Sequence, residues 1–309
     1  MPVVTVRDAQ EGDAEAIADV WASAVPYLVR TPARAAADLR NDAILHRRRW
    51  VGLVDDRVAG TAAARAVHGA GAPDEVVLSI EVRPDLGSRG VGTALLKAAT
   101  SAFSDATVLR ATSTDDPISM AFAVRNGFLP EGEQQIAAVD THVVGPVGAA
   151  PEGLRPISLG SLPDLAMLFD AYHQVAGEQP SGLGTSLEKL SAEELRLAWW
   201  ESPDNAPELS WGLVSDKASE PVLAAFSTVS VDRRRRRSWN TVTATLPDYR
   251  GRGLASWVKR RTLNALRSTG ITGAWTAEDS TNAAMLAVNR RLGYEPVATS
   301  VRVARRLPH

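Results

Sequence analysis

The chain has 309 residues, of which 45% are hydrophobic and 23% are charged, and its formal net charge is −2. At roughly 100–200 residues per domain this length favours two folded domains, and the near-neutral charge gives no general reason to expect binding to nucleic acid or membranes. Cysteine is absent, which excludes disulfides, thiolate metal ligands and a cysteine nucleophile.

The start of the chain and its histidines narrow the class further. The first 20 residues lack a basic segment followed by an apolar run, so no secretory signal is expected. No stretch of about 18 apolar residues occurs, so no membrane span is expected, and the predicted location is cytoplasmic. The five histidines show no metal-ligand spacing, so no metal is predicted.

Hydrophobic periodicity predicts strands and helices in alternation along the first half of the chain. A short strand and a helix are followed by a hairpin, then by two strand–helix pairs and closing strands. The predicted strands are 3–7, 50–54, 58–66, 76–82, 106–112 and the strands within 128–144, and the predicted helices are 13–25, 92–103 and 117–125.

The stretch 145–153 is rich in Gly, Pro and Ala and is predicted to link two domains, 1–144 and 154–309. Strands that alternate with helices around an antiparallel hairpin indicate a mixed α/β (α+β) sheet in each domain. In the second half the predicted strands are 154–157, 211–214, 222–231, 238–246, 271–276 and 297–305, and the predicted helices are 162–176, 187–200, 254–267 and 282–291.

Three short motifs recur in the same order in the two halves, which indicates an internal repeat. Each half has a Val-Gly-Leu-Val or Trp-Gly-Leu-Val strand, an Arg-Gly pair that opens a helix, and a Gly-Phe or Gly-Tyr turn. The matched segments are 51–54 with 211–214, 89–92 with 252–255, and 127–128 with 293–294.

The sharpest local signal is the Gly-rich turn 247–255 (PDYRGRGLA), which lies between a predicted strand and a predicted helix. Such a turn exposes backbone N–H groups at the positive end of the helix dipole, so it suits a pyrophosphate. Arg250 and Arg252 add charge-assisted donors. The turn lacks the Gly-Lys-Ser/Thr of a nucleotide-triphosphate loop, and a purely structural turn is the alternative.

These residues resemble a known family. Arg250-Gly251-Arg252-Gly253-Leu254-Ala255 looks like the Arg/Gln-x-x-Gly-x-Gly/Ala signature of the GNAT superfamily of N-acyltransferases, and 282–294 resembles the family's fourth helix and following turn. In the first half, 87–92 (GSRGVG) matches except that Gly87 stands where Arg or Gln is usual. The two-module architecture is similar to that of mycothiol synthase, and the likeness concerns architecture alone.

The resemblance implies two tandem GNAT folds, each with a mixed, mostly antiparallel sheet whose central strands splay apart. The donor, acetyl-CoA, is then expected to place its pantetheine arm between those strands, where a backbone amide near Thr245 polarises the thioester carbonyl. The first half is expected to have a partly degenerate cofactor loop and the second half an intact one. The implied cofactor-binding residues are Val82, Ser88, Arg89, Gly90, Val91, Gly92, Thr93, Thr245, Leu246, Arg250, Gly251, Arg252, Gly253, Leu254, Ala255 and Asn282.

The candidate catalytic residues are Glu81, Glu278 and Asn289. Glu81 ends a strand of the first half and is interpreted either as the base that deprotonates the amine or as a solvated strand-end carboxylate. Glu278 is expected just after a strand of the second half, as a base or as a loop surface charge. Asn289 and Ala123 occupy the position where the family has a tyrosine that protonates the leaving thiolate, so both halves lack that phenol.

The resemblance thus implies an N-acetyltransferase that acts on a small-molecule amine by direct attack on the thioester, with the second half favoured as the principal site. Two alternatives stay open. The run Arg233 to Arg237 is predicted to be a solvated hairpin turn or an anion-binding patch, and a patch that binds tRNA would suit an aminoacyl-tRNA donor. A non-catalytic acyl-CoA-binding scaffold is the other. The chain is expected to be a monomer or a homodimer.

Overall fold

The computed structural model describes residues 4–67, 75–86, 89–176, 190–216 and 221–307. The chain forms two compact units, and neither is a continuous stretch of sequence. Unit 1 comprises Met1–Glu133, Leu183–Pro203 and Ser300–His309, and unit 2 comprises Gln134–Gly182 and Asp204–Thr299. The sequence predicted two contiguous domains, 1–144 and 154–309, so each unit contains a segment that was expected in the other domain.

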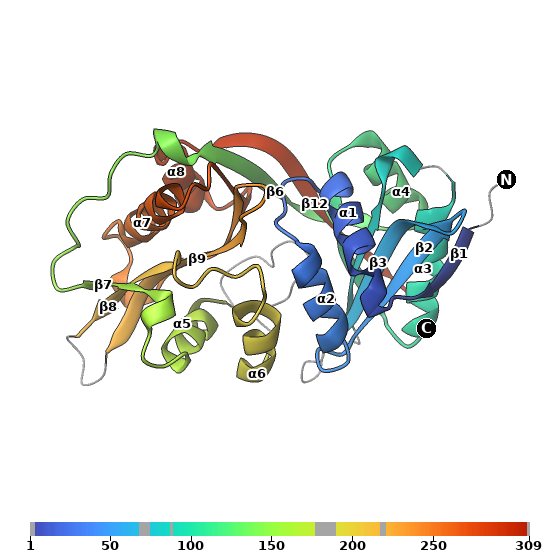
Figure 1. Ribbon diagram of the computed structural model, residues 1–309, viewed down its shortest axis with the longest axis horizontal. Coiled ribbons are helices and arrows are strands. Elements are labelled where there is room, and N and C mark those ends of the chain that lie inside the picture. Colours follow the sequence, from blue (N-terminus) through green and yellow to red (C-terminus); the bar gives the residue numbers. More distant parts are fainter. Residues whose placement is uncertain (1–3, 68–74, 87–88, 177–189, 217–220, 308–309) are drawn as a thin grey trace. The chain divides into compact units, whose positions relative to one another are not determined.

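Unit 1 is built on strands in the order β1-β2-β3-β4-β5-β12, with helices on both faces (Figure 1). Neighbouring residues of a strand point to opposite faces. Trp50 accordingly packs with the α3 residue Leu95, whereas Val51 packs with the α1 residue Ile17. The strands are β1 (Val4–Asp8), β2 (Arg47–Val54), β3 (Arg57–Val67), β4 (Glu75–Val82), β5 (Val108–Thr114) and β12 (Glu295–Arg306), and the helices are α1 (Ala14–Ala24), α2 (Pro32–Asn41), α3 (Val91–Ala102), α4 (Pro117–Arg125) and the short α6 (Ala192–Leu195).

Unit 2 repeats the plan with strands in the order β6-β11-β10-β9-β8-β7. Helix α7 packs on the sheet, and its buried residues Leu254 and Val258 meet the strand residues Leu213 and Ala225. The strands are β6 (Leu129–Asp140), β7 (Arg155–Ser158), β8 (Trp211–Ser215), β9 (Val222–Asp232), β10 (Arg237–Thr245) and β11 (Gly273–Asp279), and the helices are α5 (Ala166–Ala176), α7 (Leu254–Ser268) and α8 (Ala283–Arg291).

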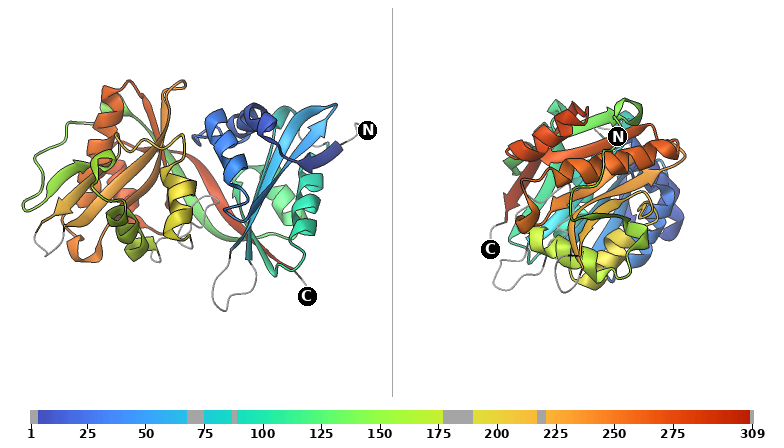
Figure 2. Two further views of the ribbon diagram at one scale, coloured as in Figure 1. Left: turned by 60° about the horizontal axis from the view of Figure 1, so that its bottom comes forward. Right: turned by 90° about the vertical axis from the view of Figure 1, so that its left-hand side faces the viewer.

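The last strand of each half is exchanged. Strand β6 follows β5 in sequence, but residues 134–140 pair antiparallel with β11 in unit 2. Strand β12 ends the chain, and residues 300–306 pair antiparallel with β5 in unit 1. Figure 2 shows the red end of β12 beside the teal strands of that unit. Val301 and Val303 are 4% and 3% exposed and belong to the core of unit 1.

In both units the two central strands run parallel over a short distance and then separate. Strands β4 and β5 pair at residues 75–77 with 108–110, and β10 and β11 pair at 237–239 with 273–275. Beyond these residues the parallel pairing ends, while β4 and β10 keep their antiparallel partners β3 and β9. The splayed central strands expected from the sequence are therefore confirmed.

One helix was not predicted from the sequence. Helix α2 was not predicted, because Leu39 is the one large apolar residue of PARAAADLRN. Its start is defined by Pro32 in the first turn and by the Arg34 amide, which donates to Thr31 Oγ1. The stretch 145–153 has neither helix nor strand, and it lies along α7, where Trp257 Nε1 donates to the carbonyls of Gly148 and Ala149 at 3.2 and 3.0 Å. Within the described residues, no helix has the length and apolarity needed to cross a membrane.

Candidate functional site

Each unit has a helix that begins at a left-handed glycine. Gly253 caps α7 with φ of 74°, Gly251 precedes it with φ of 76°, and Gly90 caps α3 with φ of 87°. A Cβ added at any of the three would meet nothing within 4 Å, so the space in front of both loops is open. The first amides of a helix have no intrahelical acceptor, and the dipole there favours an anion. Both loops therefore fit a diphosphate group.

The predicted loop residues lie around these glycines. In unit 2, Arg250 Nε donates to the carbonyl of Thr245 at 3.3 Å, and an Arg252 guanidinium nitrogen donates to the carbonyl of Glu152 at 3.0 Å. These bonds hold both arginines beside the loop. In unit 1, Arg89 is exposed next to Gly90, and Ser88 lies outside the described residues. The helix starts hold the remaining predicted loop residues, which are Val91, Gly92 and Thr93 in α3 and Leu254 and Ala255 in α7.

The end of β10 leads directly into the unit 2 loop. The Thr245 hydroxyl oxygen is buried and has no hydrogen-bond partner within the described part of the chain. Such an unpaired buried atom is uncommon in proteins and suits a position that a ligand completes. The amide of Leu246 donates to the Ala224 carbonyl at 2.9 Å, so it is already occupied by β9. Val82 is the last residue of β4, the strand of unit 1 that corresponds to β10.

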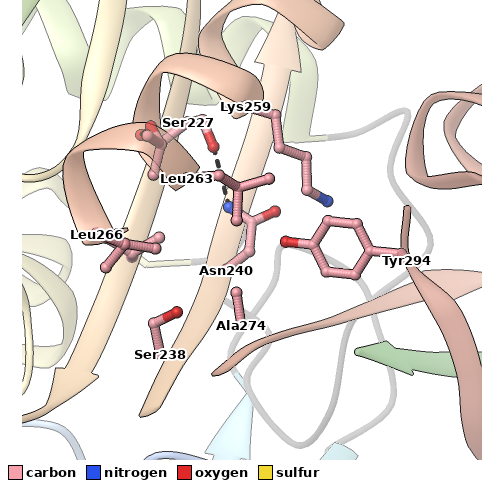
Figure 3. Close-up of a pocket in the computed structure, with 10 residues that line it drawn as sticks. Ser227, Ser238, Asn240, Lys259, Leu263, Leu266, Ala274 and Tyr294 are labelled. Atoms are coloured by element: carbon pink, nitrogen blue, oxygen red, sulfur yellow. Dashed lines mark hydrogen bonds between the residues drawn. The ribbon is translucent and has the colours of Figure 1, made fainter. Parts of the chain in front are cut away.

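A buried polar cluster lies where β10 and β11 separate. Lys259 of α7 is 1% exposed, and its Nζ donates to Asn289 Oδ1 at 2.7 Å and to Thr276 Oγ1 at 3.1 Å. The same nitrogen lies 4.8 Å from the ring centre of Tyr294. Asn240 of β10 completes the cluster (Figure 3). These side chains form a buried polar network at the point where the two strands separate.

Burial sets the protonation of two groups in this cluster. Burial lowers the pKa of Lys259 from 10.5 to about 7, against the opposing charge of Glu278. Burial also raises the pKa of the Glu278 carboxyl above its usual range, while the charge of Lys259 and the hydrogen bond from Asn282 oppose that rise. A carboxyl with a raised pKa beside an amine with a lowered pKa is a combination that is typical of catalytic sites.

The corresponding cluster in unit 1 is apolar. Lys259 follows Gly253 by six residues, as Leu96 follows Gly90, and the other positions match through the strand pairing and the Gly-Phe and Gly-Tyr turns. Leu96 is 4% exposed and Ala123 is 6% exposed. The correspondences are Asn240 with Leu78, Lys259 with Leu96, Thr276 with Ala111, Asn289 with Ala123, and Tyr294 with Phe128. The two units therefore share a backbone plan, but they differ in the side chains at the point where the two central strands separate, which we call the splay.

The three predicted catalytic residues do not gather in one place. Glu81 lies on β4 in unit 1, is 8% exposed, and accepts from the Arg30 guanidinium at 3.2 Å and from the Ser79 hydroxyl at 3.4 Å. It is thus a buried, ion-paired carboxylate and not a solvated one. Glu278 and Asn289 both lie in unit 2, on β11 and α8.

The interpretation of Glu278 as a loop surface charge is wrong. Strand β11 extends to Asp279, which makes Glu278 a strand residue, and Asn282 Nδ2 donates to its carboxylate at 2.8 Å. Asn282 also caps α8, because its Oδ1 accepts from the Met285 amide at 3.2 Å. The strand predicted from the sequence ended at Thr276, which is three residues too early. The polar composition of 276–279 (TAED) resembles that of a loop, although these residues continue the strand.

Lys259 was not among the residues predicted from the sequence. A signal for it exists: Thr262, Leu263 and Leu266 follow it at helical spacing and are all buried. A lysine within an apolar stripe is a buried-charge candidate, because a solvent-facing lysine lies on the opposite face of the helix. The segment 254–267 was predicted as a helix, and Lys259 was not singled out in it.

The arginine run forms the turn between β9 and β10 and is largely engaged by unit 2. It contacts acidic side chains, a carbonyl and a ring of that unit: Arg233 with Glu208 at 2.6 Å, Arg235 with Asp232 at 3.5 Å, Arg236 with the Gly270 carbonyl at 2.8 Å, and Arg237 with the Trp275 ring at 5.0 Å. These contacts fit the hairpin-turn interpretation. Binding of tRNA by this run stays a prediction, as does the oligomeric state.

Comparison with known proteins agrees with the fold. The sequence profile of the acetyltransferase (GNAT) family matches residues 16–128 and 175–294. A tandem GNAT protein from the clavulanic acid biosynthesis pathway is 22% identical, with a TM-score of 0.72 over 99% of this chain and 100% of that chain. An N-acetyltransferase from Sphaerobacter thermophilus is 18% identical, with a TM-score of 0.66 over 98% and 95% of the two chains. No curated protein sequence matches significantly.

A two-unit fold with splayed central strands and a glycine-capped helix in each unit defines a tandem acyl-transfer architecture. The chain belongs to the acetyltransferase (GNAT) family. The family implies transfer of an acyl group from acyl-CoA to an amine. At identities of 18–22% the structural neighbours establish the fold alone.

A prediction on stability follows from Lys259. Between about pH 7 and 10.5 the unfolded chain binds the Lys259 proton more fully than the folded chain does. Because stability rises with pH wherever the unfolded state binds more protons, the wild type should gain stability across this window, by at most about 1.4 kcal/mol per pH unit. Lys259→Met lacks this gain, because methionine does not titrate.

Denaturant unfolding of both proteins at pH 7, 8.5 and 10 measures the effect. The stability of the variant relative to wild type should decline as the pH rises. Lys97→Met, an exposed change on α3, serves as the control and should follow wild type at each pH. A constant difference between wild type and Lys259→Met would mean that the lysine keeps its ordinary pKa.

Proposed function

We propose that the protein transfers the acetyl group of acetyl-CoA to an amine of a small molecule, and that unit 2 is the working site. The observation that carries this proposal is the combination, in one unit, of an open glycine loop and a buried polar cluster at the point where β10 and β11 separate. Unit 1 also has a glycine loop, but the side chains where its central strands separate are apolar. Its carboxylate Glu81 forms an ion pair with Arg30.

The donor would be held by groups of unit 2. Its diphosphate would take the free amides of the α7 start at Gly253, Leu254 and Ala255, with Arg250 and Arg252 adding charge at the loop. Its pantetheine arm would follow the free edge of β10 beyond Trp239, where pairing with β11 ends. The Thr245 hydroxyl has no hydrogen-bond partner among the described residues, and an amide or carbonyl of the bound arm would supply one.

The acceptor amine must lose a proton to attack the thioester. Glu278 is the carboxylate of unit 2 with a raised pKa, and it lies on the splayed strand β11. A base with a pKa closer to neutral both accepts a proton and returns it more readily than an ordinary carboxylate. We therefore assign Glu278 the role of base, directly or through a water. Asn289 has no titratable group and positions Lys259.

Calorimetric titration with acetyl-CoA tests the donor site. Gly253→Glu forces a side chain into φ of 74° and places a carboxylate where the diphosphate would bind, so the affinity of unit 2 should fall by at least about 100-fold. Gly90→Glu does the same at φ of 87° in unit 1. Gly12→Glu is the control, because a Cβ at Gly12 also meets nothing within 4 Å and Gly12 belongs to neither loop.

Each outcome has a definite meaning. Loss of binding with Gly253→Glu alone places the donor in unit 2, and two independent losses give each unit a donor site. Turnover is then measured as thiol release with a panel of amines. Binding without turnover of any amine would favour the non-catalytic scaffold. If wild type binds no acetyl-CoA, the acetyltransferase proposal is wrong, and an aminoacyl-tRNA donor is tested next.

A further inference from the structure

Lys259 is a charged side chain at a position that is almost completely buried. It is one of four lysines in the chain and is 1% exposed between α7 and the sheet. A buried ammonium costs free energy unless it is paired, and its two direct hydrogen bonds, to Asn289 and Thr276, go to neutral groups. Unit 1 fills the same position with Leu96 and keeps the fold, so packing alone does not require a lysine.

The nitrogen of Lys259 lies at the vertex of the splay. The last parallel pair of β10 and β11 joins Trp239 to Trp275, and Thr276, which accepts from Nζ, is the next residue of β11. Asn240, the next residue of β10, lies in the same cluster, and Thr276 Oγ1 donates to its Oδ1 at 3.5 Å. A donor arm that follows β10 from the Gly253 loop toward the vertex therefore approaches Lys259 with its far end, which carries the thioester.

Resting on the donor site proposed above, we propose that Lys259 is a catalytic residue that gives its proton to the coenzyme A sulfur as the thioester bond breaks. The amine nitrogen forms a C–N bond with the acetyl carbon, and the electron pair of the C–S bond stays on sulfur. Glu278 takes the proton that the amine loses, and sulfur takes the proton of Lys259 Nζ. Transfer of the Glu278 proton to the neutral Lys259, through solvent, restores both groups, and the products are an amide and a thiol.

The surroundings of Lys259 suit this role. Among the described residues, Glu278 of β11 is the charge that acts on Lys259, and Tyr294, whose pKa burial raises, is the other titratable group against it. Asn240 and Asn289 contribute neutral amides from β10 and α8. An ordinary thiol has a pKa of about 8.5, so an ammonium with a pKa of about 7 transfers its proton to a thiolate downhill.

Carbon-13 NMR of the lysine side chains tests the contact between Nζ and sulfur without an acceptor. The full chain is labelled at lysine Cε, the Lys259 signal is assigned by its loss in Lys259→Met, and its pH titration is followed alone, with coenzyme A and with desulfo-coenzyme A. A thiolate beside an ammonium raises the pKa of the ammonium by about 1–3 units. The Lys259 midpoint should therefore rise by at least about one unit more with coenzyme A than with the sulfur-free analogue.

Kinetics supply the second readout, with acetyl-CoA and the best amine of the panel. Lys259→Met should lower kcat by about 100-fold while leaving the KM for acetyl-CoA within about threefold, because general-acid help acts on the chemical step. The wild-type decline of kcat on the alkaline side, where Lys259 loses its proton, should vanish in the variant. Lys97→Met, the same change on the exposed face of α3, should keep wild-type values.

The outcomes separate this inference from the proposed function. If calorimetry detects no acetyl-CoA at unit 2, the donor site itself is wrong. If the donor binds but coenzyme A and desulfo-coenzyme A shift Lys259 equally, Nζ does not contact the sulfur and the inference is overturned, whether or not the variant folds. An unchanged kcat in a folded Lys259→Met overturns it as well.

Discussion

Replacing Val301 by aspartate is expected to destabilise unit 1 by at least about 3 kcal/mol, although residue 301 lies in the last strand of the chain. Val301 is 4% exposed in the core that contains Leu95 and Leu109. Its strand pairs with β5 from Ser300 to Arg306. A carboxylate there would be buried without a partner, so the aspartate must either protonate or pull β12 out of the sheet.

Val297→Asp is the matched control on the same strand. Val297 is 54% exposed, and the same substitution there should change the free energy of unfolding by less than about 0.5 kcal/mol. Denaturant unfolding gives the magnitudes, and hydrogen exchange locates them. Amides of β5 and α3 should lose protection in Val301→Asp before those of β10 and α7. Loss confined to unit 2 would contradict the exchange of strands.

Replacing Asp38 by asparagine is expected to cost about 3–5 kcal/mol, since it removes one of the two carboxylates that neutralise a buried group of arginines. Asp38 of α2 is 9% exposed and pairs with Arg34, Arg47 and Arg49 at 2.8, 3.2 and 3.4 Å. These guanidinium groups hold the pKa of the Asp38 carboxyl far below its usual range despite burial. Asp42 then remains as the carboxylate for Arg47 and Arg49.

The pH dependence checks the cause. The folded-state pKa of Asp38 is lowered, so its stabilisation is present above the unfolded value near 3.9 and is lost as the pH falls below it. The gap between wild type and Asp38→Asn should therefore narrow from pH 6 to pH 3 in denaturant unfolding. Arg40→Ala, which breaks the exposed pair with Glu11, is the control and should cost at most about 1 kcal/mol at either pH.

The local signals in the sequence were strong at the loops. Strand β10, the glycines at 251 and 253 and helix α7 follow one another in sequence, so composition and periodicity revealed them together. The same holds for β4, Gly90 and α3. These features depend on residues within a few positions of one another, and the conformational freedom of glycine is visible in the sequence itself.

The sequence was less informative about Glu81, Glu278 and Lys259. The surroundings of Glu81 are set by Arg30, which lies 51 residues earlier, and no periodicity reports such a contact. Glu278 was placed in a loop because TAED has a polar composition, although pairing with β6 extends the strand. Lys259 was hidden in an apolar stripe whose partners Thr276 and Asn289 lie on other elements.

By itself the sequence determined the family, the internal repeat, most helices and strands, and the two glycine-capped helix starts, because each of these is written in short-range patterns. Only the tertiary structure decided that β6 and β12 change places and that the splay is polar in unit 2 and apolar in unit 1. The physical reason is that strand pairing and burial depend on contacts between residues far apart in the chain. The same alternating strand satisfies its backbone hydrogen bonds beside either partner, and a lysine acquires a lowered pKa only when other elements close over it.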